Sequence, residues 1–219
     1  MIPLSDRRPP FVRLTHQVGR IVIGTMARSV TLEGLDRPDL PRSGPLIVAS
    51  NHISNGDPGV IGSWLSPALG RQLHWLGKEE SLRWPLLGWA IAQNGVIGIR
   101  RGAADIDAFR TARRVLDEGL VLVVFPEGTR SRSASLQEAK DGVAILALRT
   151  GATILPVGVS GTEVFWPRGK LPQFAGDVAM RVGAPFQLEP SDDGDRKAAQ
   201  RAATETIMAR IAELLPPAY

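Results

Sequence analysis

The chain has 219 residues, of which 43% are hydrophobic and 22% charged, so it is long enough for one folded domain with a buried core. It contains no cysteine, which excludes disulfides, thiolate nucleophiles and cysteine-ligated metal sites. A three-histidine metal site would need all three histidines and is not expected. The formal net charge is +4, and only four of the 26 basic residues are Lys, so the Arg-rich surface favours an anionic partner such as a phosphorylated metabolite, an acidic lipid headgroup or nucleic acid.

The sequence shows neither a membrane-spanning segment nor an export signal. No run of about 18 apolar residues is present. The first apolar segment is interrupted by Arg13, His16 and Arg20, so it lacks the continuous core of a secretory signal peptide. These patterns favour a cytoplasmic protein.

Residues 10–30 have the pattern of an amphipathic helix. The residues on its apolar arc are Phe11, Leu14, Val18, Ile21, Val22 and Met26, with Val12 and Ile23 widening the arc. The residues opposite are Arg13, His16, Gln17 and Arg20. Such a helix packs on a domain or lies in a bilayer interface with its arginines toward the headgroups, and the pattern alone leaves both open.

Short apolar runs and helical patterns alternate along the rest of the chain. Strands are predicted at residues 45–49, 73–76, 96–99, 120–125, 153–159 and 178–182. Helices are predicted from residue 58 and over residues 84–93, 104–118, 136–149 and 196–215. The alternation predicts an α/β fold with a mixed, mainly parallel sheet flanked by helices, preceded by the N-terminal amphipathic helix. A turn-rich linker over residues 40–45 divides the chain into a membrane-associating segment, 1–43, and a domain, 44–219.

Polar clusters follow several of the predicted strands, where parallel sheets bind their ligands. The clusters span residues 51–57, 98–102 and 125–132, and an apolar–Pro–apolar triplet spans residues 155–157. His52 and Asp57 suggest a base with its orienting carboxylate. The residues that suggest a phosphate cradle are Arg101, Arg130 and Arg132, with the backbone amides around Gly128.

Each cluster also has a purely structural interpretation. Asp57 followed by Pro58 resembles a helix N-cap with Pro at the first helical position. His52 could be an ordinary loop histidine, and the arginines a solvated face. Other signatures are missing: there is no phosphate-binding loop or dinucleotide fingerprint, and Thr162 stands where a nucleophile elbow needs its final Gly.

Taken together, the clusters resemble the blocks of the glycerolipid acyltransferase family, best known for 1-acylglycerol-3-phosphate acyltransferases. Asn51, His52 and Asp57 match its N-H-x4-D block, and residues 125–131 read F-P-E-G-T-R-S, its third block, without exception. Residues 155–157 match the hydrophobic–Pro–hydrophobic fourth block. Arg101 matches the Arg of the second block, whereas Arg100 stands where relatives often carry Asp.

The resemblance implies acyl transfer from acyl-CoA or acyl carrier protein to a hydroxyl of lysophosphatidic acid, forming phosphatidic acid. His52 would be the general base and Asp57 its orienting carboxylate. The residues expected to hold the acceptor phosphate are Arg101, Glu127, Gly128, Thr129 and Arg130. The residues expected to border the acyl chain are Leu155, Pro156 and Val157.

This chemistry requires no metal or organic cofactor. A lipid acceptor favours interfacial insertion of residues 10–30, so we expect a peripheral protein at the cytoplasmic face of a membrane. Another lyso-lipid or glycolipid acceptor is the nearest alternative. A catalytically silent membrane-surface module is a second alternative, against which the presence of both His52 and Asp57 argues. Nucleic acid is not expected, because the arginines lack interleaved aromatic residues.

Overall fold

The computed structural model describes residues 4–99, 104–131, 135–167, 169–171, 173–189, 195–217 and 219. Its strands are β1 (Ser29–Glu33), β2 (Leu46–Ser50), β3 (Leu73–Lys78), β4 (Val96–Ile99), β5 (Val121–Val124), β6 (Thr153–Ser160) and β7 (Asp177–Val182). Its α-helices are α1 (Pro10–Met26), α2 (Asp57–Leu69), α3 (Leu87–Gln93), α4 (Ala104–Asp117), α5 (Gly142–Thr150), α6 (Thr162–Phe165) and α7 (Arg196–Ala212). A 3₁₀ helix, η1 (Glu79–Arg83), precedes α3.

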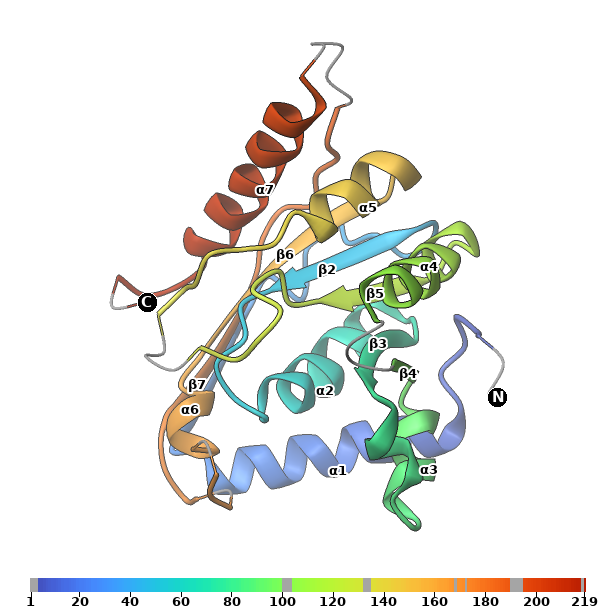
Figure 1. Ribbon diagram of the computed structural model, residues 1–219. Coiled ribbons are helices and arrows are strands. Elements are labelled where there is room, and N and C mark those ends of the chain that lie inside the picture. Colours follow the sequence, from blue (N-terminus) through green and yellow to red (C-terminus); the bar gives the residue numbers. More distant parts are fainter. Residues whose placement is uncertain are drawn as a thin grey trace.

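The strands form one twisted sheet in the order β1-β7-β6-β2-β5-β3-β4. Every neighbouring pair is parallel except β6 and β7, which are antiparallel. The sheet lies between two helical layers, with α1 and α2 on one face and α4, α5 and α7 on the other (Figure 1). The predicted α/β class with a mixed, mainly parallel sheet is therefore confirmed.

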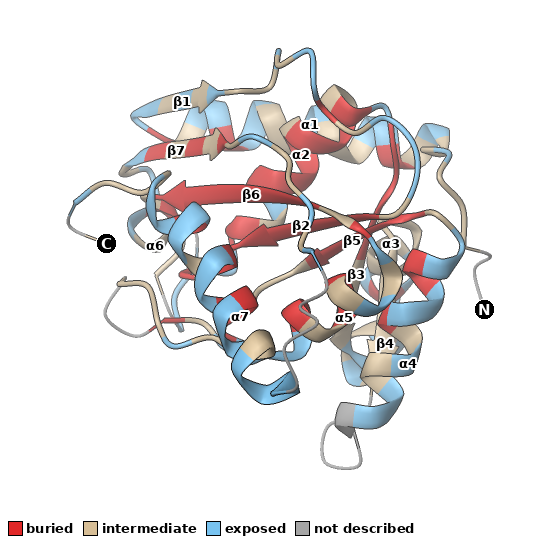
Figure 2. Cartoon of the chain, turned by 90° about the horizontal axis from the view of Figure 1, so that it is seen from above, coloured by how far each residue is buried: buried red, intermediate tan, exposed pale blue. Residues whose placement is uncertain are grey.

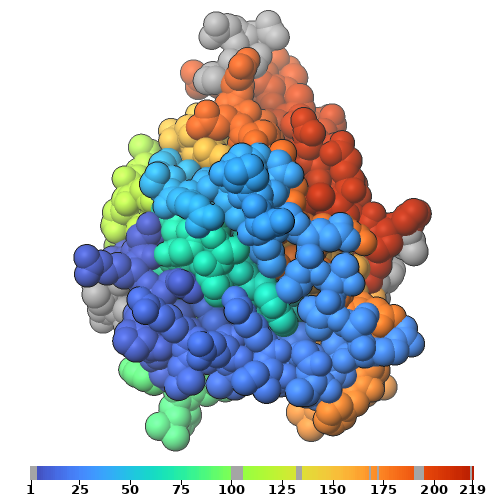
Figure 3. All heavy atoms as spheres, turned by 180° about the vertical axis from the view of Figure 1, so that it is seen from behind, coloured from blue at the N-terminus to red at the C-terminus, as the bar shows by residue number. Residues whose placement is uncertain are grey.

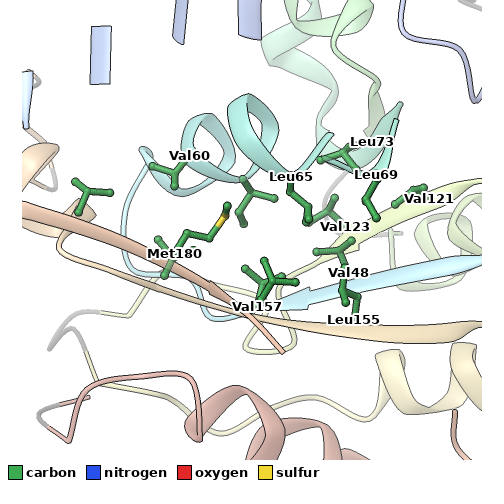
Figure 4. Close-up of a cluster of buried hydrophobic side chains, with 14 of the residues drawn as sticks. Val48, Val60, Leu65, Leu69, Leu73, Val121, Val123, Leu155, Val157 and Met180 are labelled. Atoms are coloured by element: carbon green, nitrogen blue, oxygen red, sulfur yellow. The ribbon is translucent and has the colours of Figure 1, made fainter. Parts of the chain in front are cut away.

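The strands at the centre of the sheet are covered on both faces. All five residues of β2 are buried, which explains why this strand reads as a continuous apolar run (Figure 2). One face packs against α2, and the residues that meet there include Val60, Leu65 and Leu69 of the helix and Val48, Val123, Leu155, Val157 and Met180 of the sheet (Figure 4). This packing holds the carboxyl ends of β2, β5 and β6 together at one edge.

The sequence-based elements do not include α6 or η1, and the last helix ends at Ala212, three residues earlier than predicted. Three further differences concern longer segments. β1 was not predicted: it is a half-exposed edge strand that pairs with β7, and it begins within residues 10–30, where the sequence predicts a single helix. The helix predicted over 84–93 begins only at Leu87. The helix predicted from residue 136 begins at Gly142, because residues 135–140 form an irregular loop.

Helix α1 packs against the domain through one edge of its predicted apolar arc. Its fully buried residues are Val12 and Ile23, and Nε of Arg20 donates a 2.7 Å hydrogen bond to the carbonyl oxygen of Ser63 in α2. Most of the predicted apolar arc is exposed instead: Leu14, Val18, Ile21 and Val22 are each between 44% and 65% exposed. α1 forms the outer surface of the molecule on this side (Figure 3).

Within the described residues, none of the helices combines the length and the apolar character that a bilayer-spanning segment requires.

Candidate active site

The loop between β2 and α2 carries the first polar cluster. Its first residue, Asn51, is buried and binds the neighbouring strand β6 with both polar atoms of its side-chain amide. Its Nδ2 donates to the carbonyl oxygen of Val159, and its Oδ1 accepts from the Val159 N–H, each at 2.8 Å. Asn51 therefore fixes the start of the loop on β6 and does not face a substrate.

His52 and Asp57 are in direct contact, as the sequence predicted. Nδ1 of His52 lies 2.7 Å from Oδ2 of Asp57, and the carboxylate is fully buried whereas the His52 side chain is 18% exposed. Because Asp57 carries no proton to donate when ionised, the bond places the imidazole proton on Nδ1. The lone pair on Nε2 is then left to accept a proton.

The structure does not support the interpretation of Asp57 as a helix N-cap. Gly56 occupies the N-cap position of α2, and Asp57 is the first residue of the helix. Its Oδ2 accepts the N–H groups of Ile53 and Ser54, which precede it, at 2.8 and 2.9 Å. The carboxylate therefore closes the loop around His52, and these N–H groups stabilise its charge.

The loop after β5 packs against the same histidine. The ring of Phe125 stacks on the His52 imidazole with a centroid separation of 4.0 Å and an interplanar angle of 15°. The Ser131 N–H donates to the His52 carbonyl oxygen at 2.7 Å. The first and third polar clusters thus form a single unit.

Glu127 lies behind this unit and does not fit the predicted contact with an acceptor phosphate. Its side chain is buried, and its two carboxylate oxygens accept the N–H groups of His52 (2.8 Å) and Gln137 (3.2 Å). Burial raises the pKa of this carboxyl group, and the two hydrogen bonds oppose that shift. A buried carboxylate would repel a phosphate, and the contact that Glu127 makes here is with the His52 main chain.

The remaining residues of the turn face outward. Gly128 has φ +70°, Thr129 is exposed, and Nη1 of Arg130 donates to Oδ1 of Asn55 at 2.8 Å. A residue outside the predicted set joins them: the end of the Lys140 side chain lies beside Gly128. Arg130 and Lys140 supply two cations at the rim of the site.

The other predicted site residues fall into two groups. Arg100, Arg101 and Arg132 lie outside the described residues. Residues 155–157 are buried in β6, where they pair with β2, and none of them lines the cavity beside His52. Their position in the sheet interior does not fit the predicted contact with an acyl chain.

A cavity of about 730 Å³ opens beside His52. Its lining is mainly apolar and comes from α1, α2, α3, β3 and β5, and its residues include Gly62, Trp75, Ile91, Val123 and Phe125. The lining residues of β3 run from Leu73 to Gly77, a span of about 13 Å along the strand at roughly 3.3 Å per residue.

Among the described residues, no group of three His, Asp or Glu side chains is placed to hold a metal ion.

Comparisons with known proteins agree with this arrangement. The sequence profile of the family described as Acyltransferase matches residues 30–160, which include His52, Asp57 and the turn from Glu127 to Arg130. The chain belongs to the acyltransferase family. The sequence-based resemblance to glycerolipid acyltransferases is thereby confirmed.

Several family members with assigned activities are similar to this chain over part of their length. The chloroplastic 1-acyl-sn-glycerol-3-phosphate acyltransferase LPAT1 of Arabidopsis thaliana is 32% identical over 64% of this chain and 38% of its own length. The 1-acyl-sn-glycerol-3-phosphate acyltransferase of Cocos nucifera is 28% identical over 80% of this chain and 55% of its own. A lyso-ornithine lipid O-acyltransferase of Pseudomonas aeruginosa is 32% identical over 80% of this chain and 64% of its own. The matched region is thus about half the length of such relatives.

The fold is shared with a solved structure, the 1-acyl-sn-glycerophosphate acyltransferase PlsC from Thermotoga maritima. The two superpose with a TM-score of 0.73, covering 93% of this acyltransferase and 79% of the other chain at 24% sequence identity.

Proposed function

We propose that this acyltransferase moves a fatty acyl group from acyl-CoA or acyl carrier protein to the free hydroxyl of 1-acylglycerol-3-phosphate, forming phosphatidic acid. The observation that carries the proposal is the contact of His52 Nδ1 with the buried Asp57 beside a mainly apolar cavity. An alcohol needs a base to become nucleophilic, and a cavity of this lining suits a hydrocarbon chain.

The proposed reaction uses the Nε2 lone pair of His52, which lies on the ring edge that Asp57 does not contact. The acceptor hydroxyl gives its proton to Nε2 while its oxygen attacks the thioester carbonyl carbon. The C–S bond then breaks, and the imidazolium returns the proton to the leaving thiolate. Asp57 holds the ring in the required tautomer and stabilises the imidazolium, as the carboxylate does in a Ser-His-Asp triad. The acceptor takes the place of the enzyme serine, so no covalent enzyme intermediate is needed.

The acceptor phosphate is proposed to bind at the rim formed by Arg130 and Lys140. The Arg130 guanidinium has donors left after its bond to Asn55, and a guanidinium binds phosphate in a bidentate manner. Arg101 is proposed as a further ligand on the strength of the sequence block alone. The acyl chain is proposed to lie in the cavity.

A membrane surface is the proposed source of the lipid acceptor. The exposed apolar face of α1 (Leu14, Val18, Ile21 and Val22) continues onto the segment before and within α3, because Phe11 contacts Trp89 with a ring separation of 4.6 Å. This segment extends past α1 at one end of the helix (Figure 1) and exposes Trp84, Leu86, Leu87 and Trp89. Leu86 is 90% exposed and has φ +58°, an unfavourable backbone conformation for leucine.

The charge around this apolar surface suits an anionic bilayer. Residues 7–32 contain five Arg and no Asp or Glu. Large exposed apolar side chains next to arginines, with Trp among them, are typical of segments that lie in a membrane interface. The protein would then bind peripherally, with α1 and α3, two walls of the cavity, next to the lipid.

A lyso-ornithine lipid is the second candidate acceptor, because the Pseudomonas aeruginosa relative covers as much of this chain as the others do. An ornithine headgroup presents a carboxylate and an ammonium group in place of a phosphate. The cations Arg130 and Lys140 favour the phosphorylated acceptor.

The test is an acceptor panel. Purified protein is incubated with one labelled acyl-CoA and a set of lyso-lipids, and the products are separated by mass, with the His52→Ala variant as control. We expect phosphatidic acid from the wild type and a rate lower by a factor of about 10² to 10⁴ in His52→Ala. If no acceptor leads to consumption of the thioester, the proposal is contradicted and the silent binding module is favoured. If only lyso-ornithine lipid is acylated, the acceptor is reassigned.

A further inference from the structure

The buried carboxylate of Asp57 has a further partner, on its other oxygen, that no sequence block contains. Its Oδ2 binds His52, whereas its Oδ1 accepts a hydrogen bond from Oγ1 of Thr162. Thr162 is completely buried and lies 105 residues further along the chain, at the first position of α6. Oδ2 of Asp57 is thus held by His52 and two main-chain N–H groups, and Oδ1 is held by Thr162.

The backbone conformation of the turn that carries Thr162 is restricted by close contacts with β7 and with the His52 loop. Gly161, at its start, has φ +81°, and a Cβ atom there would collide with the backbone carbonyl of Asp177 in β7. The turn is also tied to the His52 loop, since Oγ of Ser54 donates to the carbonyl oxygen of Trp166 at 2.8 Å. The hydroxyl of Thr162 therefore meets Asp57 from a rigid support.

Tyr219 holds this turn from outside. Its phenolic oxygen accepts the Gly161 N–H at 3.0 Å and donates to Oε1 of Glu163 at 2.5 Å. Burial and the bond to Glu163 raise the pKa of Tyr219, so the phenol stays protonated and can donate. The main-chain carbonyl of Tyr219 accepts the N–H of Leu136. The next residue, Gln137, donates its N–H to Glu127. Tyr219 thus joins the two segments that support the His52 loop.

We infer that Thr162 and Tyr219 are positioning residues for the His52–Asp57 pair: the Thr162 hydroxyl orients the Asp57 carboxylate, and the Tyr219 hydroxyl holds the turn that presents Thr162. The inference rests on the proposed base mechanism. A carboxylate fixed through both oxygens cannot rotate, so the imidazole keeps the orientation in which Nε2 meets the acceptor hydroxyl. Preorganisation of this kind lowers the barrier to proton transfer, and neither residue touches the substrate in this arrangement.

The experiment compares kcat, both KM values and the pH dependence of kcat in four variants. Thr162→Val removes the hydroxyl while keeping the branched shape, and Thr162→Ser restores it. Tyr219→Phe removes only the phenolic oxygen. The matched control is Thr206→Val on α7, where the hydroxyl bonds only to the carbonyl of Ala202 in its own helix.

We expect kcat of Thr162→Val to fall about tenfold or more, the loss typical for a hydrogen bond to a charged group, with both KM values unchanged. The acid limb of its kcat profile should move to higher pH, because a carboxylate with one donor fewer attracts the imidazolium more strongly. The other titratable groups near Asp57 are Glu127, Glu163 and Tyr219, and all remain in this variant. Thr162→Ser should recover most of both changes, Tyr219→Phe should show them in weaker form, and Thr206→Val should show neither.

Wild-type kcat and an unmoved acid limb in Thr162→Val would overturn the inference. So would a loss of kcat that accompanies a loss of folded protein, leaves the limb unmoved and is not recovered by Thr162→Ser, because packing alone would explain it. The proposed function fails separately, through full activity of His52→Ala. If Thr162→Val does not fold, Tyr219→Phe and Thr162→Ser still decide, since the inference requires a limb shift in the first and near wild-type behaviour in the second.

Discussion

The main-chain N–H of His52 donates a 2.8 Å hydrogen bond to the carboxylate of Glu127, a residue 75 positions further along the chain. The acidic residue of the F-P-E-G-T-R-S block is thereby bound to the backbone of the proposed base. This bond, the ring stacking of Phe125 and the bond from Ser131 make one rigid body of two loops that leave neighbouring strands.

Replacing Glu127 by Gln tests this positioning role. Gln has a single side-chain acceptor, so one of the two N–H groups of His52 and Gln137 loses its partner. We expect kcat to fall about tenfold or more, because hydrogen bonds to charged groups are worth about 1.5 to 3 kcal/mol, while the acceptor KM stays near the wild-type value. Steady-state kinetics against both substrates measures this. A raised acceptor KM with unchanged kcat would restore the phosphate-binding role expected from the sequence.

Removing Arg130 should weaken binding of the phosphorylated acceptor without affecting binding of the acyl donor. Arg130→Ala is expected to raise the KM for a phosphorylated acceptor by roughly 10- to 100-fold, the equivalent of one charge-assisted hydrogen bond, and to leave the acyl-CoA KM unchanged. The same result is expected for Arg101→Ala on the basis of the sequence block. Arg201→Ala, an exposed arginine of α7 on the opposite side of the sheet, is the matched control. Unchanged acceptor KM values in both site variants would place the phosphate elsewhere.

The cavity predicts a dependence on acyl-chain length. Gly62 lines it from α2, and a Cβ atom there would lie 3.6 Å from Nε2 of His16 and 4.0 Å from the Trp75 ring. A Leu side chain at this position would extend further and occupy space in the cavity. We expect Gly62→Leu to lower kcat/KM for long-chain acyl-CoA far more than for short-chain acyl-CoA, measured as a ratio across a donor series. An equal loss for all chain lengths would show that the acyl chain binds elsewhere.

The exposed face of α1 predicts which substitutions affect membrane binding. Val18 is half-exposed, so Val18→Asp should leave the urea midpoint nearly unchanged. The same substitution should reduce co-sedimentation with anionic vesicles about tenfold or more, because full burial of such a side chain contributes roughly 1.5 to 3 kcal/mol. Gln17→Asp, an exposed polar position one residue away, adds the same charge and is the control. Higher salt should weaken binding of the wild type, because its arginines contribute about 1 kcal/mol each near an anionic surface. Unfolding of Val18→Asp would show instead that this face is core.

The buried side of α1 predicts a pH effect on stability. Burial, reinforced by the charges of Arg8 and Arg20, lowers the pKa of His16 from about 6.5 to about 4. The unfolded chain therefore binds more protons than the folded one between these values, and stability falls as the pH drops from about 6.5 toward about 4. The urea midpoint of the wild type should fall over this range more than that of His16→Gln, which lacks the titrating group. Parallel midpoints in the two proteins would contradict the effect.

The sequence was most informative where one short segment contains both partners of an interaction. His52 and Asp57 are five residues apart, and the contact between them was predicted because this spacing occurs together with the other blocks of the acyltransferase family. The strands were equally clear at the centre of the sheet, because residues buried on both faces form continuous apolar runs. β1 was missed because it lies at the edge, where alternating exposure over five residues gives a weak signal.

Contacts across long sequence separations could not be anticipated. The bonds from Glu127 go to main-chain N–H groups, which every residue except proline carries, and the Thr162 hydroxyl reaches Asp57 over 105 residues. In the sequence, Thr162 is notable only because it stands where a nucleophile elbow would need its final Gly. The pattern of residues 10–30 alone left the orientation of α1 open, because amphipathicity does not distinguish an apolar face that meets a protein core from one that meets a bilayer. Here Val12, His16, Gly19 and Ile23 pack inward, and the wider apolar arc is left outside.

The strand order sets when the catalytic pair can be completed during synthesis of the chain. β2 lies between β5 and β6, so the His52 loop gains Glu127 only after the ribosome has added a further 75 residues, and Asp57 gains Thr162 only after 105. Contacts of such separation form late and make folding slow. The apolar arc of α1 (Pro10–Met26), by contrast, precedes all of these residues in the chain. If the proposed function holds, a nascent chain would expose the apolar arc of α1 before the His52–Asp57 pair has all its supporting contacts, so an unfinished chain could bind a bilayer before it could transfer an acyl group there.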